Sequence, residues 1–230
     1  MKFGGLQKLT LLDYPDKVAA TVFTVGCNLR CPFCHNFSMV VGNADNLEQL
    51  TEEDVLAFLN KRSKVLEGVC VTGGEPLIQP NIEEFLTKVR AMGYSIKLDT
   101  NGAFPDKLAG LIERGLIDYV AMDVKNCKEA YADTVGCAVD LGAIEKSVEL
   151  LKSGVVDYEF RTTVTATFHT ADGIKAMAKW LVGAKRLYLQ QFVDSGDLID
   201  ATVTGVDEET LKKYCEIAKE FVPNTQLRGV

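Results

Sequence analysis

Residues 19–36 read AATVFTVGCNLRCPFCHN, a short apolar run that passes directly into three closely spaced cysteines. The run at 19–25 is rich in β-forming residues and carries no charge, which predicts a buried strand. Cys27, Cys31 and Cys34 follow in a C-x3-C-x2-C pattern, so their thiols are predicted to lie on a loop at the carboxyl end of that strand. In parallel α/β folds, ligands bind at this end of the strands. The stretch therefore predicts both a fold class and the place of a site.

Similar β-rich runs alternate with helical patterns along the whole chain, as is typical of a parallel sheet built from strand–helix units. Six such units are too few for a closed eight-stranded barrel. We therefore expect an α/β fold, a partial (β/α)6 barrel with a doubly wound sheet as the alternative, in a single domain of residues 1–230. The predicted strands are residues 19–25, 68–71, 94–98, 119–124, 158–164 and 186–190. The predicted helices are residues 51–61, 81–92, 105–114, 142–152, 171–181 and 207–221.

Composition limits the class of protein. A chain of 230 residues that is 47% hydrophobic is long enough for one sizeable core. With 25 Lys and Arg against 32 Asp and Glu, the net charge of -7 argues against nucleic-acid binding, which needs clustered positive charge. The longest nearly apolar stretch, residues 18–25, is too short for a membrane helix, and the N-terminus has no signal-peptide pattern. We expect a cytoplasmic protein without a nucleic-acid or membrane partner.

Three of the seven cysteines crowd into eight residues, which in a chain without an export signal indicates metal or redox chemistry before a disulfide. Three thiolates on one loop can hold three irons of a [4Fe-4S] cluster and leave the fourth iron open to an outside ligand. A zinc site is the alternative, but it needs a fourth protein ligand, and the nearby candidate, His35, directly follows Cys34. The other cysteines are expected to be small buried hydrophobic residues: Cys70, Cys127, Cys137 and Cys215.

Unusual polar residues follow two further predicted strands. Residues 72–75 read TGGE, in which the two glycines allow the backbone to approach a ligand closely, although an ordinary strand-ending turn would have the same pattern. Asp99 lies at the end of the third strand. The Asn-Gly turn that follows accounts for residues 101 and 102 but gives no reason for an acidic residue at position 99.

The next two strands also carry charge. Asp123 and Lys125 share one face of the fourth strand by its period of two. Carboxylates placed together at a sheet end repel each other, so Asp99 and Asp123 predict a cation or a cationic ligand between them, with a structural ion pair of Asp123 and Lys125 as the alternative. On the fifth strand, a buried Arg161 needs an anionic partner. That partner is either an acid of the protein, Glu159 or a neighbouring one, or the carboxylate of a ligand.

The cysteine loop, with aromatic Phe33 just before its third cysteine, resembles the defining motif of the radical S-adenosylmethionine (SAM) enzymes. The continuation His35-Asn36 resembles more narrowly the activases of glycyl radical enzymes. The phrases KLDTNG (97–102), YVAMDVK (119–125) and YEFRTTV (158–164) are most similar to anaerobic ribonucleoside-triphosphate reductase activating proteins. The resemblance extends from GGLQKLTLLDYP (4–15) through LQQF (189–192).

The resemblance implies a role for each of these positions. SAM's methionine part would chelate the open iron of a cluster on Cys27, Cys31 and Cys34. In pyruvate formate-lyase activating enzyme, the acids equivalent to Asp99 and Asp123 surround a small cation. SAM itself would be met by Phe33, Thr72, Gly73, Gly74, Glu75, Lys125, Arg161 and Gln191. A monovalent cation would lie at Asp99 and Asp123, the partner's glycine loop would enter at Asp13, and His35 and Asn36 would lie beside the cluster ligands.

Two positions have simpler readings as well. Asp13 can be a turn residue ahead of Pro15. Gln191 stands where pyruvate formate-lyase activases carry a histidine near the SAM ribose, and this chain has none there. His169, at the lead-in to a predicted helix, is expected to be solvated or to cap that helix.

The implied function is that of an activase. A reduced cluster would pass one electron to SAM, giving methionine and a 5′-deoxyadenosyl radical that takes a hydrogen atom from a glycine of the reductase, with flavodoxin or ferredoxin as the electron donor. No catalytic side chain beyond the cluster and SAM is predicted. Pyruvate formate-lyase, another glycyl radical enzyme or a small molecule are alternative targets. A non-enzymatic iron–sulfur electron carrier is the third possibility, but a carrier needs no open iron.

Overall fold

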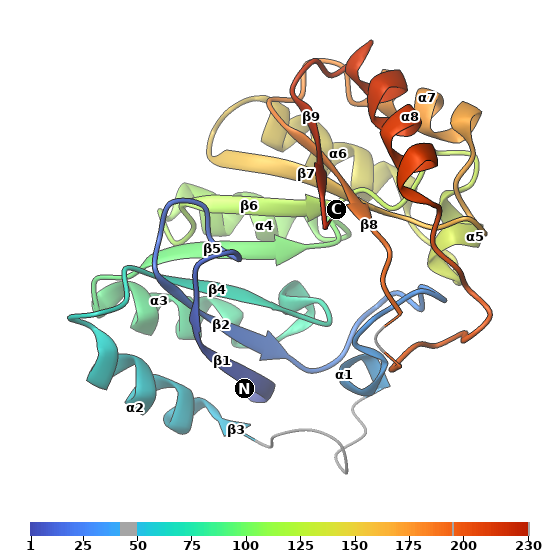
Figure 1. Ribbon diagram of the computed structural model, residues 1–230. Helices are drawn as coiled ribbons and strands as arrows, with labels where there is room; N and C mark the ends of the chain where they lie inside the picture. Colours follow the sequence, from blue (N-terminus) through green and yellow to red (C-terminus); the bar gives the residue numbers. More distant parts are fainter. Residues whose placement is uncertain (42–49, 195, 230) are drawn as a thin grey trace. The chain divides into compact units, whose positions relative to one another are not determined.

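The computed structural model describes residues 1–41, 50–194 and 196–229, which form two compact units. The first unit comprises Met1–Asn28, Ser38–Thr100 and Asp106–Val120, and the second Leu29–Phe37, Asn101–Pro105 and Ala121–Val230. Figure 1 labels their helices and strands. The first unit contains, apart from single terminal residues, β1 (Lys2–Thr10), β2 (Ala19–Thr24), α1 (Phe37–Val41), β3 (Leu50–Thr51), α2 (Glu52–Arg62), β4 (Gly68–Gly73), the short helix η2 (Pro76–Ile78), α3 (Ile82–Ala91), β5 (Ser95–Thr100) and α4 (Pro105–Glu113). The chain passes into the second unit along β6 (Tyr119–Asp123), followed by α5 (Tyr131–Val135), α6 (Leu141–Lys152), β7 (Asp157–Val164), α7 (Ala171–Trp180), β8 (Leu187–Gln191), α8 (Glu208–Lys219) and β9 (Thr225–Arg228).

All six predicted strands are present, as β2 and β4 to β8, and each of the six predicted helices is found with its ends within two residues of the expected ones. The count of six strands was too low, because the described residues also contain β1, β3 and β9. These three escape the pattern for local reasons. β1 contains two adjacent glycines and several polar residues, whereas β3 and β9 have only two and four residues.

The first unit has the strand order β3-β1-β2-β4-β5, in which β2, β4 and β5 are parallel and β1 is antiparallel to β2. Side chains alternate between its two faces. Along one face the registered rows are wholly apolar and 0% exposed: Ala20, Val69 and Ile96, then Val22, Val71 and Leu98. Helix α3, which contacts β5, contributes Phe85, Leu86 and Val89 to the same buried core.

The opposite face of these strands is polar. Thr21, Cys70 and Lys97 occupy one registered row across β2, β4 and β5, and all three are buried. Buried polar groups are stable only when they find partners, so this row marks a part of the interior that does more than fill space.

The second unit has the order β6-β7-β8-β9, with β7, β8 and β9 parallel. Figure 1 shows α8 (red) beside these last strands and next to α7, and both helices bury an apolar stripe. Apart from the two-residue strand β3, the strands from β2 onward follow the chain order within each unit, as in the predicted partial (β/α)6 barrel, whereas a doubly wound sheet reverses direction. The predicted α/β fold with a mostly parallel sheet is confirmed. No helix among the described residues is long and apolar enough to cross a membrane.

The strand β9 is fastened by a partly buried ion pair. Glu159 on β7 is 1% exposed, and its two carboxylate oxygens accept hydrogen bonds from Arg228 at 2.8 and 3.2 Å. The guanidinium also lies over the Tyr188 ring, 3.9 Å from its centroid. This arrangement uses the fork shape of arginine, which lysine lacks.

We expect Arg228→Gln to lower the free energy of unfolding by about 2 kcal/mol, because it leaves the Glu159 carboxylate buried without its cation. Urea denaturation followed by circular dichroism measures the change. The exposed pair Lys213–Glu209 on α8 supplies the control, since Lys213→Gln should change the same quantity by less than about 1 kcal/mol. Equal effects of the two substitutions would contradict the role given to Arg228.

Candidate functional site

The turn after β4 lies against the start of the cysteine loop in the first unit. Gly74 donates its backbone N–H to the Thr24 carbonyl at 2.9 Å, and Glu75 donates to the Gly26 carbonyl at 2.8 Å. A Cβ atom on Gly74 would lie 1.9 Å from the Gly26 carbonyl oxygen, and one on Gly73, whose φ is 114°, would lie 2.3 Å from the Thr24 nitrogen. Neither position has room for a side chain. The two glycines therefore set the path of the backbone that leads into the cysteine loop.

The Glu75 carboxylate is fully buried and strengthens the same turn. Its Oε1 accepts a hydrogen bond from the Leu77 N–H at 3.0 Å and another from the Thr100 hydroxyl at 2.9 Å. The Thr72 carbonyl accepts one from the Thr24 hydroxyl at 3.0 Å. The Glu75 side chain thus joins the turn to the end of β5, so this predicted SAM residue has a structural part within the unit.

Loop residues 29–37 are held by other elements of the second unit. The Arg30 N–H donates to the Val135 carbonyl at the end of α5 at 3.0 Å, and the Asp200 N–H donates to the Pro32 carbonyl at 2.9 Å. Gly136 ends α5 in a left-handed conformation, and a Cβ there would lie 2.5 Å from the Arg30 carbonyl oxygen. The short helix α5, which sequence reasoning missed, is therefore one of the supports of the cysteine loop.

Cys31 and Cys34 lie on a tight turn in which the Cys34 N–H donates to the Cys31 carbonyl at 3.0 Å. Cys31 is buried and Cys34 is half-buried. Burial raises the pKa of the Cys34 thiol, while a hydrogen bond from the Asn36 backbone and the nearby Lys125 ammonium act to lower that pKa. The backbone of Asn36 thus lies beside the thiol of Cys34.

Two aromatic contacts fix the side chains between and after these cysteines. Phe33 is 3% exposed, and its ring centroid lies 6.0 Å from that of Phe168. The His35 ring stacks on Phe192 with centroids 5.3 Å apart, and burial lowers the pKa of the imidazole. Phe33 and His35 therefore have packing partners on the segments that follow β7 and β8.

The donor set of the loop fits an iron–sulfur cluster. Three thiols within eight residues are soft ligands of the kind that iron–sulfur clusters use, and they lie on irregular backbone directly after a strand. In residues 1–41, 50–194 and 196–229, no group of three or more His, Cys, Asp or Glu side chains is gathered closely enough to hold a metal ion. The fit therefore rests on the chemistry of the donors.

Asp123 at the end of β6 carries two cations. Its Oδ1 lies 3.0 Å from Arg161 Nε and its Oδ2 lies 3.1 Å from Lys125 Nζ. Burial acts to raise the pKa of the Asp123 carboxyl, but the two cations outweigh it and hold that pKa at about 2. The pKa of Lys125 is raised by the same carboxylate. Arg161 thus has a neighbouring acid as a partner, and the Asp123 carboxylate binds two cations.

His169 differs from expectation, because it is 2% exposed rather than solvated. Its Nδ1 accepts a hydrogen bond from the Thr165 N–H at 3.1 Å, so that nitrogen carries no proton. The proton is therefore on Nε2, which donates to the Lys125 carbonyl at 2.9 Å. Burial lowers the pKa of His169. The neutral imidazole therefore holds the backbone of Lys125, whose ammonium binds Asp123.

A second support of the same backbone is Tyr131 on α5. Its hydroxyl accepts a hydrogen bond from the Lys125 N–H at 3.3 Å. The Tyr131 ring lies edge-on to Trp180, with centroids 6.3 Å apart, and the Lys128 ammonium lies 5.2 Å from the centroid of the Trp180 ring.

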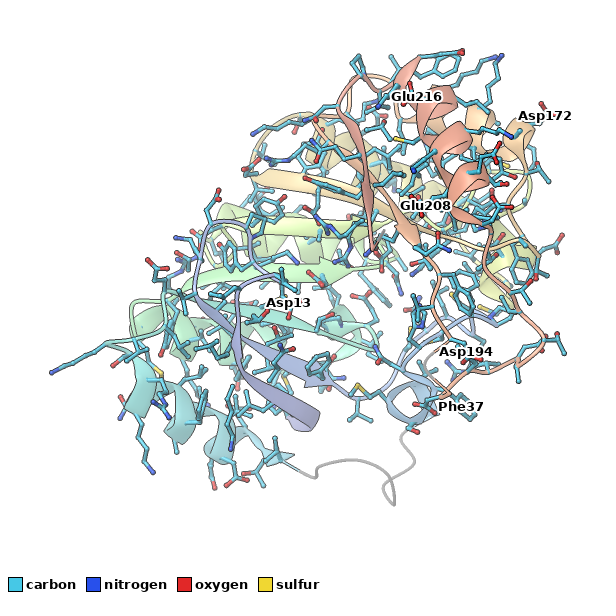
Figure 2. All side chains as sticks on the ribbon, in the orientation of Figure 1. Asp13, Phe37, Asp172, Asp194, Glu208 and Glu216 are labelled. Carbon is cyan, nitrogen blue, oxygen red and sulfur yellow. The ribbon has the colours of Figure 1, made fainter. Side chains whose placement is uncertain are left out.

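The remaining predicted residues have different surroundings. Gln191 at the end of β8 donates from Nε2 to the Val206 carbonyl at 2.7 Å, and its buried Oε1 has no hydrogen-bond partner among the described residues. Asp13, on the segment before β2 (Figure 2), accepts a hydrogen bond from the Thr21 hydroxyl at 2.5 Å. Asp99 contacts the ammonium of Lys97.

Sequence reasoning did not single out Lys97 or Arg228, and for His169 it did not foresee the hydrogen bond to the Lys125 carbonyl. A signal existed for Lys97, since a charged residue in an apolar strand two positions before Asp99 must share its face. No local signal existed for Arg228, whose partner is 69 residues away.

The chain is similar to known proteins both in sequence and in fold. A family model described as the radical SAM superfamily matches residues 21–181. A Methanocaldococcus jannaschii protein named "Putative glycyl-radical enzyme activating enzyme" is 30% identical over 233 residues, covering 98% of this chain and 95% of that protein. A pyruvate formate-lyase-activating enzyme of Listeria monocytogenes is 32% identical over 132 residues, 53% of this chain and 52% of that protein.

Two solved structures share the fold. A domain of pyruvate-formate lyase-activating enzyme from Bacteroides vulgatus has a TM-score of 0.58 and 18% identity, and the match covers 70% of this chain and 99% of that domain. Streptococcus suis SuiB bound to precursor peptide SuiA has a TM-score of 0.72 and 14% identity over 91% of this chain and 48% of that one.

Gly74→Ala is expected to lower the free energy of unfolding by about 1 to 3 kcal/mol, because the new methyl group would collide with the Gly26 backbone. Chemical denaturation measures this loss, and iron analysis after anaerobic reconstitution should show that less iron is retained. Gly110→Ala is the matched control, since a Cβ there meets no atom within 4 Å and alanine favours helix α4. If both variants behave like the wild type, the contact does not set the loop.

His169 should make stability depend on pH. Because its folded pKa lies below the unfolded value of about 6.5, the unfolded chain binds the proton first. The contribution is therefore complete above that pH and is lost as the pH falls below it, with a slope of at most about 1.4 kcal/mol per pH unit.

The difference between wild type and His169→Gln, measured by urea denaturation at several pH values, isolates this contribution. Glutamine can keep both hydrogen bonds but cannot take up a proton. A difference that does not vary between about pH 7.5 and 5 would show that His169 does not titrate on unfolding.

Proposed function

The chain belongs to the radical SAM superfamily, and we propose that it is the activase that installs the glycyl radical of an anaerobic ribonucleoside-triphosphate reductase. The observation that carries the activase part is the near full-length match to the M. jannaschii relative named for this activity, combined with the C-x3-C-x2-C loop after β2. Residues 1–230 would act as a single radical SAM domain.

Enzymes of this superfamily use a [4Fe-4S] cluster and SAM, and Cys27, Cys31 and Cys34 are the residues that would hold the cluster here. When bound, these groups supply a one-electron cleavage of SAM that yields methionine and a 5′-deoxyadenosyl radical. The polypeptide has to position the target carbon and exclude competing molecules, because such a radical reacts with whatever lies closest.

The second unit offers groups that suit SAM. Lys125 and Arg161 bring two cationic side chains to Asp123, and these are the groups that would meet the carboxylate of SAM. The buried Oε1 of Gln191 is an acceptor without a partner among the described residues, and a ribose hydroxyl would satisfy it. Phe33 would meet SAM from the cysteine loop.

The first unit offers mainly backbone. The backbone of the turn formed by Thr72, Gly73 and Gly74 would meet the ammonium group of SAM. Glu75 holds that turn in place from within the protein.

The reductase is proposed as the target because KLDTNG, YVAMDVK and YEFRTTV resemble its activating proteins most. Asp13 would border the entry of the partner's glycine loop, and flavodoxin or ferredoxin would supply the electron. Pyruvate formate-lyase is the second candidate target, favoured by the 32% identity to the Listeria enzyme, which covers about half of each chain.

Anaerobic reconstitution tests the chemistry. The wild type should retain about four irons per chain and, once reduced, convert SAM to methionine and 5′-deoxyadenosine, whereas Cys31→Ala should lose at least about tenfold in both. Cys215→Ser, a buried cysteine on α8, is the matched control and should behave as wild type. Full cluster content in Cys31→Ala would sink the proposal.

Mixing the reduced enzyme and SAM with each candidate partner separates the targets. A glycyl doublet in the electron paramagnetic resonance spectrum should form with the reductase and not with pyruvate formate-lyase. The opposite result would assign the second target, and SAM cleavage without a radical on either partner would leave the cofactor chemistry and remove both targets.

A further inference from the structure

Lys97 is a charged residue in the middle of an apolar strand. It lies on β5, is 2% exposed, and occupies the polar row with Thr21 and Cys70. Lysine is almost never fully buried unless a partner balances its charge. The proposed chemistry assigns this lysine no part.

The partner is Asp99. It lies two residues further along the same strand and therefore on the same face, and its Oδ1 contacts the Lys97 ammonium. The Asp99 side chain is 13% exposed. Cys70, which is opposite Lys97 in the strand register, completes the cluster, with its Sγ 3.7 Å from Lys97 Nζ and 3.6 Å from Asp99 Oδ1.

This arrangement bears on the cation predicted between Asp99 and Asp123. That prediction had an ion pair of Asp123 and Lys125 as its alternative, and it considered no counter-ion for Asp99. In the described residues each acid instead has protein cations within its own unit, Lys97 for Asp99, and Arg161 with Lys125 for Asp123. A metal ion that bound Asp99 would meet an ammonium on the same carboxylate and be repelled by it.

We infer that the Lys97 ammonium is the resident counter-ion of Asp99 and takes the place of a monovalent metal ion there. Lys97 is then a positioning residue, because it neutralises and orients the Asp99 carboxylate near the end of β5. The inference goes beyond the proposed function and does not depend on which partner is activated. It implies that the protein needs neither K⁺ nor Na⁺ at this acid.

Thermal unfolding of the full chain tests the inference without using activity. At equal ionic strength, the wild type should have the same midpoint in potassium, sodium and choline chloride within about 1 °C. Lys97→Met keeps an apolar stem and removes the charge, so its midpoint in choline chloride should fall by at least about 5 °C, and potassium should restore a large part of the loss.

Two further variants sharpen the comparison. Lys88→Met breaks the exposed pair with Glu52 in the same unit and should show no difference between potassium and choline. Lys97→Met combined with Asp99→Asn removes both charges and should lose the potassium effect. A saturable potassium stabilisation of the wild type, or a Lys97→Met variant that folds and ignores potassium, would overturn the inference.

Crystals of the wild type soaked in Tl⁺, a heavy analogue of K⁺, decide the matter even if Lys97→Met does not fold. No anomalous peak should lie within bonding distance of the Asp99 carboxylate. A peak there would show that a monovalent metal ion binds beside the lysine and would refute the proposal. Loss of the activase function in a separate assay would leave this result unchanged.

Discussion

The close contact of two backbone segments is the constraint on which the first unit's part of the site depends. The Gly73-Gly74 turn can donate to the end of β2 only because neither residue has a side chain. That contact fixes the backbone at the start of the cysteine loop. The buried Glu75 carboxylate holds the turn itself, because it accepts hydrogen bonds from Leu77 and Thr100. A methyl group on Gly74 would therefore displace the start of the cysteine loop, although Gly74 itself supplies no cluster ligand.

Charge is balanced locally in the interior of each unit. Lys97 with Asp99, Arg161 and Lys125 with Asp123, and Arg228 with Glu159 all find their partners on their own strand, on a neighbouring strand or within the same unit. Buried pairs of this kind add little net stability compared with apolar side chains, but each is costly to break on one side. They therefore serve to fix the positions of the polar groups.

Much of this organisation was predictable. The six central strands follow from apolar runs, and the cysteine loop, the two glycines and the shared face of Asp123 and Lys125 follow from spacing. The strand β1 was missed because glycines and polar residues hide its period, and the part of His169 was missed because burial depends on residues far along the chain. Partners such as Arg228 for Glu159 are set by tertiary structure, which one sequence does not display. The assignments to SAM remain predictions.

The chain contains one tryptophan, and its place has a practical consequence. Trp180 packs edge-on to Tyr131, and the Tyr131 hydroxyl accepts the backbone hydrogen bond of Lys125. Its intrinsic fluorescence therefore comes from one known environment, a single ring away from the segment that would meet the cofactor. Emission wavelength and quenching can follow events at that segment in solution without any attached dye.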